Sequence, residues 1–229
     1  MIPWLDEDNP KFPDIDKALS DPDGLLAAGG NLDSTTLINA YQRGIFPWYS
    51  EPDPVLWWSP NPRCILKPDQ VHISKSMKKV LRQQTFTLSW DTAFDEVIRA
   101  CAAARAYTEE TWITDDMLNA YQNLHDQGIA HSLEVWQEDK LVGGLYGLAI
   151  GAVFFGESMF SNTNNSSKFA FIKLCEQLEK AEFALIDCQV ESEHLTRLGA
   201  YTIARQDFKR QLDAATHRHI SKPPWAYHE

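Results

Sequence analysis

The sequence of 229 residues lacks any apolar run that approaches the ~18 residues of a membrane-spanning helix. Its first ten residues are acidic and contain two prolines, which is not the pattern of a secretory signal. Both features predict a cytoplasmic protein with no membrane association.

Cysteine is scarce and scattered. The four cysteines, at positions 64, 101, 175 and 188, form no Cys-x-x-Cys pair, which favours reduced thiols over a disulfide framework or a zinc site. The seven histidines are scattered as well, and His217 and His219, two apart near the tail, have no partner that makes them a convincing metal site. The sequence therefore predicts no metal site.

Basic residues are outnumbered, with 21 Lys and Arg against 32 Asp and Glu and a net charge of −11. This balance argues against broad binding to nucleic acid, because phosphate contacts require Lys and Arg. It leaves room for a small local RNA contact and suits a basic peptide as a partner. One local basic segment, with Lys75, Lys78, Lys79 and Arg82, is either a solvated helix face or such a contact.

Hydrophobic residues make up 44% of the chain and aromatic residues 11%, enough for a sizeable core. The first sixty residues are rich in turn formers, and prolines 47, 52, 54, 60 and 62 prevent a long regular element there. We predict a small loop-rich N-terminal domain over 1–63 and a second domain over 64–229.

Regular patterns dominate the second domain. Helices are expected over 34–43 (in the first domain), from 74, and over 93–106, 114–127 and 166–181; strands are expected over 86–90, 130–137, 141–150, 152–161, 183–190 and 200–205. Strand, helix and strand over 152–190 form a βαβ unit whose strands should be parallel. The expected fold is α+β, with a mixed sheet flanked by helices.

Polar residues interrupt the two parallel strands near their ends. Alternation puts Glu157 and Met159 on one face of the first strand, and Asp187 and Gln189 on one face of the second. A carboxylate inside an apolar strand is costly unless it is paired or used. The pairs are therefore either a satisfied internal network or two sides of an active cleft.

Other motifs are weaker. The segment Gly156-Glu-Ser-Met-Phe160 lacks the last glycine of a serine nucleophile elbow, and Gly143-Gly-Leu-Tyr-Gly147 lacks the spacing of a nucleotide-binding loop. The latter glycines favour a bulge or a close backbone approach. Trp57 and Trp58 are either core residues or a stacking platform for a base.

Taken in order, many short segments resemble the leucyl/phenylalanyl-tRNA–protein transferase family over nearly the whole chain. They are Gly24-Leu-Leu-Ala-Ala-Gly-Gly30, Ala40-Tyr-Gln-Arg-Gly-Ile-Phe-Pro-Trp48, Leu56-Trp-Trp-Ser-Pro60, Thr111-Trp-Ile113, Ala130-His-Ser132, Glu134-Val-Trp136, Leu141-Val-Gly-Gly144, Gly156-Glu-Ser-Met-Phe160, Ser167-Lys168, Asp187-Cys-Gln189 and Leu198-Gly-Ala200. One such segment is a weak signal, but the series is specific.

The resemblance implies a small N-terminal domain followed by a GNAT-like acyltransferase domain. It also implies transfer of Leu or Phe, with Met as a further candidate, from aminoacyl-tRNA to proteins that begin with Arg or Lys, feeding N-end-rule degradation. The donor ester is already activated, so no cofactor or metal is expected. By the same resemblance Gln189 contacts the attacking amine, Asp187 orients it, and Glu157 fixes the amine or the ribose.

The resemblance implies sites for the remaining parts of the donor. An apolar pocket for the amino acid would be lined by Leu145, Phe154, Met159, Leu174 and Ile186. The tRNA 3′ end would be bordered by Tyr41, Trp48 and Trp112, and the basic segment would contact the tRNA backbone. Strict alternation conflicts with this pocket, because it puts Phe154 and Ile186 on faces opposite Met159 and Asp187.

Two other readings remain open. An acetyl-CoA-dependent N-acetyltransferase would need a glycine-containing phosphate loop, but the loop from Ser161 to Ser166 has no glycine. A non-catalytic adaptor for tRNA or basic N-termini would have no need of the Asp187 and Gln189 pair. We expect a monomer.

Overall fold

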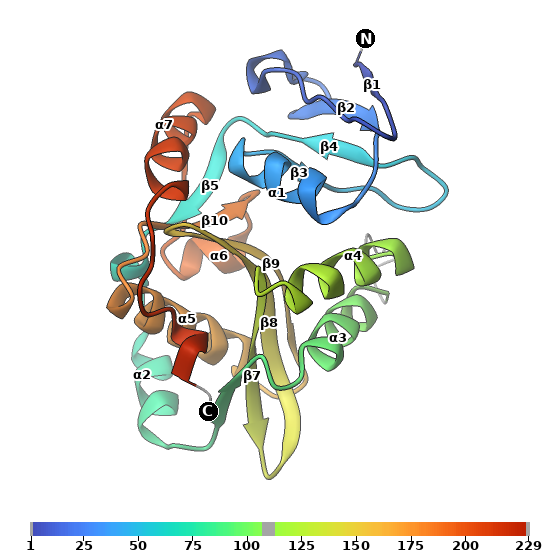
Figure 1. Ribbon diagram of the computed structural model, residues 1–229. Coiled ribbons are helices and arrows are strands. Elements are labelled where there is room, and N and C mark those ends of the chain that lie inside the picture. Colours follow the sequence, from blue (N-terminus) through green and yellow to red (C-terminus); the bar gives the residue numbers. More distant parts are fainter. Residues whose placement is uncertain (1, 107–112, 228–229) are drawn as a thin grey trace.

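The computed structural model describes residues 2–106 and 113–227 (Figure 1). Trp112, one of the expected tRNA contacts, lies outside these residues. Within them the strands form a four-stranded and a seven-stranded sheet. The structure thus has the expected mixed sheet flanked by helices, preceded by a smaller N-terminal unit.

The smaller sheet belongs to the N-terminal unit and has the order β1-β2-β4-β3. Its strands are Trp4–Leu5, Leu25–Gly29, Leu56–Trp58 and Phe46–Pro47 in that order. Helix α1, Ser34–Gln42, lies in this unit, after the 3₁₀ turn Ile15–Lys17. Asp33 caps α1, because its carboxylate accepts a hydrogen bond from the Thr36 amide at 2.6 Å.

The larger sheet has the order β11-β5-β10-β9-β8-β7-β6. The strands, in chain order, are β5 Arg63–Leu66, β6 Thr87–Trp90, β7 Ala130–Gln137, β8 Lys140–Ile150, β9 Val153–Ser161, β10 Leu185–Gln189 and β11 Tyr201–Ile203. Strands β9 and β10 are parallel and the other pairs are antiparallel. The expected parallel βαβ unit is confirmed.

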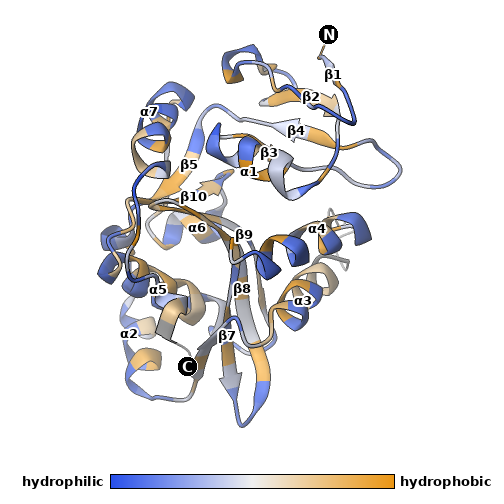
Figure 2. Cartoon of the chain, in the orientation of Figure 1, coloured by the Kyte–Doolittle hydropathy of each residue, from blue (hydrophilic) through white to orange (hydrophobic). Residues whose placement is uncertain are grey.

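Helices cover both faces of the larger sheet. They are α2 Lys75–Arg82, α3 Phe94–Ala106, α4 Asp115–Asp126, α5 Ser166–Lys180, α6 Glu193–Arg197 and α7 Arg205–Thr216, with 3₁₀ turns Pro68–Gln70 and Pro224–Tyr227. Helices α3 and α4, together with α1 and α7, bury one face, and α5 backed by α2 buries the other. In Figure 2 hydrophilic residues are prominent on α2, α3 and α7, as expected for helices with one face in water.

Alternation along the strands divides the core in two. Tyr146, Leu148 and Phe155 face the α3–α4 side, whereas Leu145 and Phe154 face α5. Gly147 on β8 is needed for close approach: a Cβ there would lie 2.2 Å from the Phe155 carbonyl oxygen. The glycines of 143–147 therefore serve strand packing, one of the two roles that their sequence favoured.

The four short strands of the N-terminal sheet were not anticipated, and in the larger sheet and its helices neither were β5 and α7. The segment that forms β5 is short and lacks alternation, since all four of its residues are buried. It begins at Arg63, so the last residue of the expected first domain pairs within the larger sheet. Across the part of the chain that the structure describes, no helix has the length and apolar character needed to cross a membrane.

Candidate active site

The candidate site opens where the parallel strands separate. Pairing between β9 and β10 runs from Leu185 opposite Val153 to Asp187 opposite Phe155 and then stops. Beyond these residues each strand has an irregularity, β9 in its pairing with β8 and β10 in its pairing with β5. A sheet that splays at the carboxyl ends of parallel strands leaves room for a ligand there.

A bulge in β9 corrects the alternation expected from the sequence. Tyr146 pairs with Ser158 and Gly147 with Gly156, so Glu157 is the extra residue. The bulge reverses the facing of the residues that follow. Met159 consequently shares a wall with Phe154, and the expected shared face of Glu157 and Met159 is wrong.

The pocket between the strands has a volume of about 400 Å³. All five residues expected for the amino-acid pocket line it: Leu145, Phe154, Met159, Leu174 and Ile186. Helix α5 supplies Leu174 and Phe171, α6 supplies His194 and Leu195, and Phe46 to Trp48 close the side next to the N-terminal unit. The wall is largely apolar, with Glu157 and Gln189 among its polar members.

Asp187 is sealed behind this wall and does not line the pocket. Its carboxylate accepts hydrogen bonds from Arg63 Nε at 2.8 Å and Nη2 at 2.6 Å, and both side chains have no exposed surface. A third bond comes from the Gln189 backbone amide at 3.0 Å. Asp187 is therefore paired with the Arg63 guanidinium and holds the backbone at Gln189 in place.

Sequence analysis missed Arg63, which sits at the join between the two sheets. Its Nη1 donates to the Gly44 carbonyl at 3.0 Å, and its guanidinium lies 4.9 Å from the Phe46 ring centroid and 4.6 Å from that of Phe208. Through Arg63 these contacts connect Asp187 on β10 to the N-terminal unit. A buried carboxylate in a core strand does signal a hidden partner, but the sequence cannot say which cation provides it.

Gln189 is held in an unusual backbone conformation. Its φ of 56° is left-handed, which non-glycine residues rarely adopt outside functional or strained positions. Its side-chain Nε2 is buried without a hydrogen-bond partner. An orphaned amide donor beside a ligand-sized pocket is a candidate to bind a substrate oxygen.

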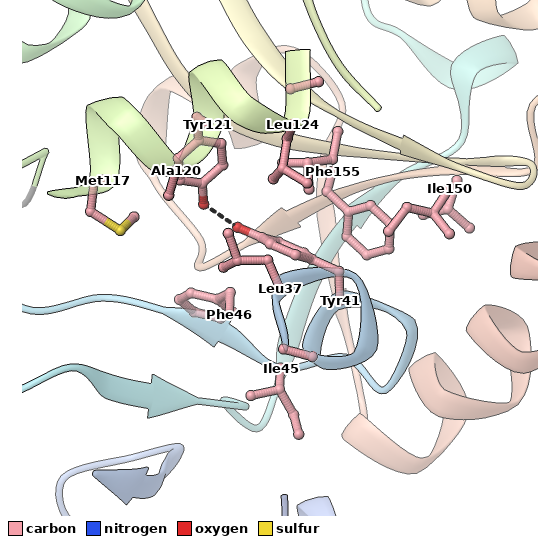
Figure 3. Packing of buried hydrophobic residues seen from close by; sticks show 14 of the residues in the cluster. Leu37, Tyr41, Ile45, Phe46, Met117, Ala120, Tyr121, Leu124, Ile150 and Phe155 are labelled. Atoms are coloured by element: carbon pink, nitrogen blue, oxygen red, sulfur yellow. Dashed lines mark hydrogen bonds between the residues drawn. The ribbon is translucent and has the colours of Figure 1, made fainter. Parts of the chain in front are cut away.

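Glu157 belongs to a closed ring of hydroxyl and carboxyl groups. Tyr41 and Tyr121 reach its two oxygens at 2.8 and 2.9 Å, and the two hydroxyls also contact each other (Figure 3). Three oxygen–oxygen contacts need three protons. The two phenols supply two, so a protonated carboxyl completes the ring and an ionised one leaves a contact without a proton.

This environment raises the pKa of Glu157 to about 7, chiefly through burial, with the charge of Asp187 adding to the effect. The hydrogen bonds from Tyr41 and Tyr121 and the charge of Arg63 lower the pKa in the opposite sense. Burial raises the pKa of both tyrosines, so they remain protonated donors. Glu157 can thus exchange a proton near neutral pH while lining the pocket.

The residues expected to border the tRNA 3′ end differ in how exposed they are. Tyr41 is fully buried and its hydroxyl donates a hydrogen bond to Glu157 within the ring, so its ring face is not exposed to a base. Trp48 is 47% exposed at the pocket and packs 5.5 Å from the Trp58 ring. Trp57 is fully buried, so it is a core residue.

The four basic side chains of α2 are all exposed, whereas Met77 anchors the helix in the core. Helix α2 packs on α5, outside the pocket. Within the described residues no three His, Cys, Asp or Glu side chains gather as a metal site would require.

An apolar pocket with an amide and a near-neutral carboxyl at its edge, set in a splayed mixed sheet, suits a transferase that handles an apolar acyl group. Comparison with known proteins makes this specific. The protein-family model described as leucyl/phenylalanyl-tRNA protein transferase matches residues 65–213, and the model of its N-terminal domain matches residues 30–61. The chain belongs to the leucyl/phenylalanyl-tRNA–protein transferase family.

Relatives that carry this name are similar over nearly their whole length. The one from Hahella chejuensis is 55% identical over 222 residues, covering 97% of this chain and 94% of the relative. The one from Cellvibrio japonicus is 53% identical, covering 93% and 90%. Among solved structures, a GCN5-related N-acetyltransferase from Kribbella flavida is 12% identical, covering 79% of this chain and 65% of that one at a TM-score of 0.40, too low to support an argument.

Proposed function

We propose that the protein transfers Leu or Phe, with Met as a further candidate, from aminoacyl-tRNA to the N-terminal amine of proteins that begin with Arg or Lys. The observation that carries the proposal is the apolar pocket of about 400 Å³ with Glu157 and Gln189 at its edge. Membership of the family supports the same reaction.

The pocket would take the donor's side chain. Its wall of Leu145, Phe154, Met159, Leu174 and Ile186 has no charged member, so a polar side chain would lose hydrogen bonds on entry. Differences of one methylene group in such a pocket change binding by only ~1–3 kcal/mol. Tolerance of Leu, Phe and Met together is consistent with that limit.

The reaction is aminolysis of an ester. The acceptor amine attacks the carbonyl carbon, the bond to the ribose oxygen breaks, and the amine proton must leave. Glu157 is our candidate for the proton acceptor, because its pKa of about 7 lies close to the ~7.7–8.0 of an α-amine. Gln189 would hold the reacting carbonyl or the amine, while Asp187 positions Gln189 rather than contacting substrate.

Recognition of the tRNA end would fall to Trp48, whose stacking on the terminal base adds ~1–3 kcal/mol. Trp112 stays a candidate from the resemblance alone. The acceptor's positive side chain would meet Glu191, an exposed carboxylate that also lines the pocket. The net charge of −11 favours a basic acceptor over an extended contact with tRNA phosphates.

Helix α2 is our candidate for the tRNA backbone contact through Lys75, Lys78, Lys79 and Arg82. Replacing Lys78 and Lys79 by Glu should raise KM for aminoacyl-tRNA several-fold, leave kcat unchanged and flatten the dependence on salt. Lys140→Glu, an exposed charge reversal in the β7–β8 hairpin, is the matched control. An equal change in both proteins would remove α2 from the interface.

We further propose that the protein works as a monomer in the cytoplasm, with domains over 1–63 and 64–229, and that its products enter N-end-rule degradation. The first test is transfer of radiolabelled Leu from Leu-tRNA to peptides that begin with Arg or Ala. Label on the Arg peptide alone supports both donor and acceptor. No label on either, with acetyl-CoA binding detected by calorimetry, would instead support an acetyltransferase.

A further inference from the structure

Cys64 on β5 and Cys188 on β10 lie side by side and have no part in the transfer described above. In the antiparallel pairing of these strands Cys64 is opposite Gln189, the residue after Cys188. Directly paired residues on neighbouring strands have Cα atoms about 5 Å apart. Cys188 occupies the irregular step next to this pair, so it is a neighbour of Cys64 across the two strands, an arrangement that suits a disulfide, whose Cα atoms lie about 4.4–6.8 Å apart.

The two side chains point to the same side of the sheet. Both belong to the core cluster on the α5 side, together with Leu66 and Ile186. The pairing irregularity between Asp187 and Gln189 accounts for this, because it inserts Cys188 beside the Cys64 position. The two thiols are close enough for each to shift the pKa of the other through a side-chain hydrogen bond.

That hydrogen bond makes the two thiols unequal. The bond from Cys188 lowers the pKa of the Cys64 thiol, and the same bond raises the pKa of Cys188, with burial adding to the rise. Cys64 is thus the first of the pair to become a thiolate, the reactive form in disulfide chemistry.

The pocket gives small molecules a route to this pair. Cys188 lines it between Ile186 and Gln189, although only 7% of its surface is exposed. The other two cysteines, Cys101 and Cys175, are buried and do not line the pocket. An occupied pocket would cover Cys188.

We propose that Cys64 and Cys188 are a modification site, at which a peroxide entering the empty pocket forms a disulfide between them. The Cys188 sulfur attacks one peroxide oxygen; the O–O bond breaks, the Cys188 proton joins the departing oxygen, and water leaves, giving a sulfenic acid. The Cys64 sulfur then attacks the Cys188 sulfur; the S–O bond breaks, the Cys64 proton joins the departing hydroxyl, and a second water leaves. Two thiols lose two electrons, and one peroxide becomes two waters.

The disulfide would draw β10 toward β5 at the residue before Gln189. The backbone N–H of Gln189 donates a hydrogen bond to the Asp187 carboxylate, and this bond supports the left-handed backbone of Gln189. The movement of β10 would therefore displace the Gln189 side chain from the pocket. The expected consequence, reversible loss of transfer, rests on the proposed function. The disulfide itself does not.

The test treats the reduced full-length protein with hydrogen peroxide, blocks remaining thiols with iodoacetamide, and digests it without reduction. We expect a linked peptide pair containing Cys64 and Cys188 at about 2 Da below the sum of the two thiol peptides. Prior addition of the donor analogue puromycin should slow its formation. Absence of the linked pair, or linkage through Cys101 or Cys175, overturns the proposal.

Activity is measured in parallel on wild type and two variants. Wild type and Cys101→Ala should lose transfer with peroxide and regain it with dithiothreitol. Cys64→Ala, whose side chain does not line the pocket, should keep its basal rate and show no loss that dithiothreitol restores. A linked pair in a protein with no basal transfer would leave the disulfide standing and count against the proposed function alone.

Discussion

Asp187 and Glu157 are carboxylates on neighbouring strands, yet their surroundings give them opposite properties. Asp187 has no exposed surface and is held by both donors of one Arg63 edge. Glu157 lines the pocket, and its hydrogen-bond partners are two neutral phenols. Asp187 is paired with a buried guanidinium, whereas burial beside two neutral phenols leaves Glu157 able to take up a proton near neutral pH.

The comparison separates positioning from proton transfer. Asp187 holds the backbone of Gln189, so its loss should act through structure. Glu157 faces the reacting groups with a pKa near neutrality, so its loss should act through protonation. Substitutions of these two carboxylates and of their neighbours test that distinction.

Replacing Asp187 by Asn has the largest expected effect. It leaves the buried Arg63 charge without a counter-ion, which typically lowers the free energy of unfolding by about 3–5 kcal/mol. Urea denaturation measures this directly. The double variant Arg63→Met with Asp187→Leu should be less destabilised, because it removes both charges. A loss below about 1 kcal/mol in Asp187→Asn would mean that the pair is not the anchor described here.

Replacing Glu157 by Gln should change how stability depends on pH. The folded pKa of about 7 lies above the ~4.3 of an unfolded glutamate, so the folded state binds more protons between these values. Wild-type stability from this group is full below about pH 4 and is lost as pH rises toward 7. Between pH 5 and pH 8 the free energy of unfolding of the variant should therefore rise relative to that of wild type, by up to about 3 kcal/mol.

Thermal unfolding of both proteins across that range makes the test. Glu134, whose pKa is also raised by burial, contributes equally to both proteins and cancels in the difference. A constant difference between pH 5 and pH 8 would show that Glu157 is already ionised throughout.

Removing one phenol should raise the pKa of Glu157 further. Tyr41→Phe or Tyr121→Phe deletes a bond to the ionised carboxylate worth about 1.5 kcal/mol, which corresponds to roughly one pKa unit. Titration of the carboxyl carbon by NMR measures the shift. Tyr49→Phe is the control, because its hydroxyl contacts Thr114 outside the ring. An unchanged pKa of Glu157 in these variants would show that the tyrosine hydroxyls do not stabilise its ionised form.

Replacing Gln189 by Gly should have the smallest effect on stability. Glycine adopts a positive φ without strain, and this gain offsets the entropy that glycine adds to the unfolded chain. The free energy of unfolding should therefore change by about 1 kcal/mol or less. Transfer should fall because the amide is gone. Chemical denaturation and the peptide assay together separate the two effects, and undiminished transfer would count against Gln189 as a substrate contact.

Much of the fold followed from local patterns. The helix caps at Ser74 and Thr114 and the strand–helix–strand order over 152–190 are set by neighbouring residues, and the structure has these elements close to the expected bounds. Strand β5 escaped prediction because a buried four-residue strand has no alternation. The bulge at Glu157 escaped for another reason: it depends on pairing with Gly147 across the hairpin.

Local sequence patterns were enough to predict most elements of the second domain, the family resemblance and the residue types available for chemistry. What the two carboxylates can do depends on the tertiary structure. Arg63 reaches Asp187 across 124 residues of sequence, and Tyr41 reaches Glu157 across 116. A carboxylate's pKa depends on burial and on the charges and donors within a few ångströms, and folding alone brings those groups together.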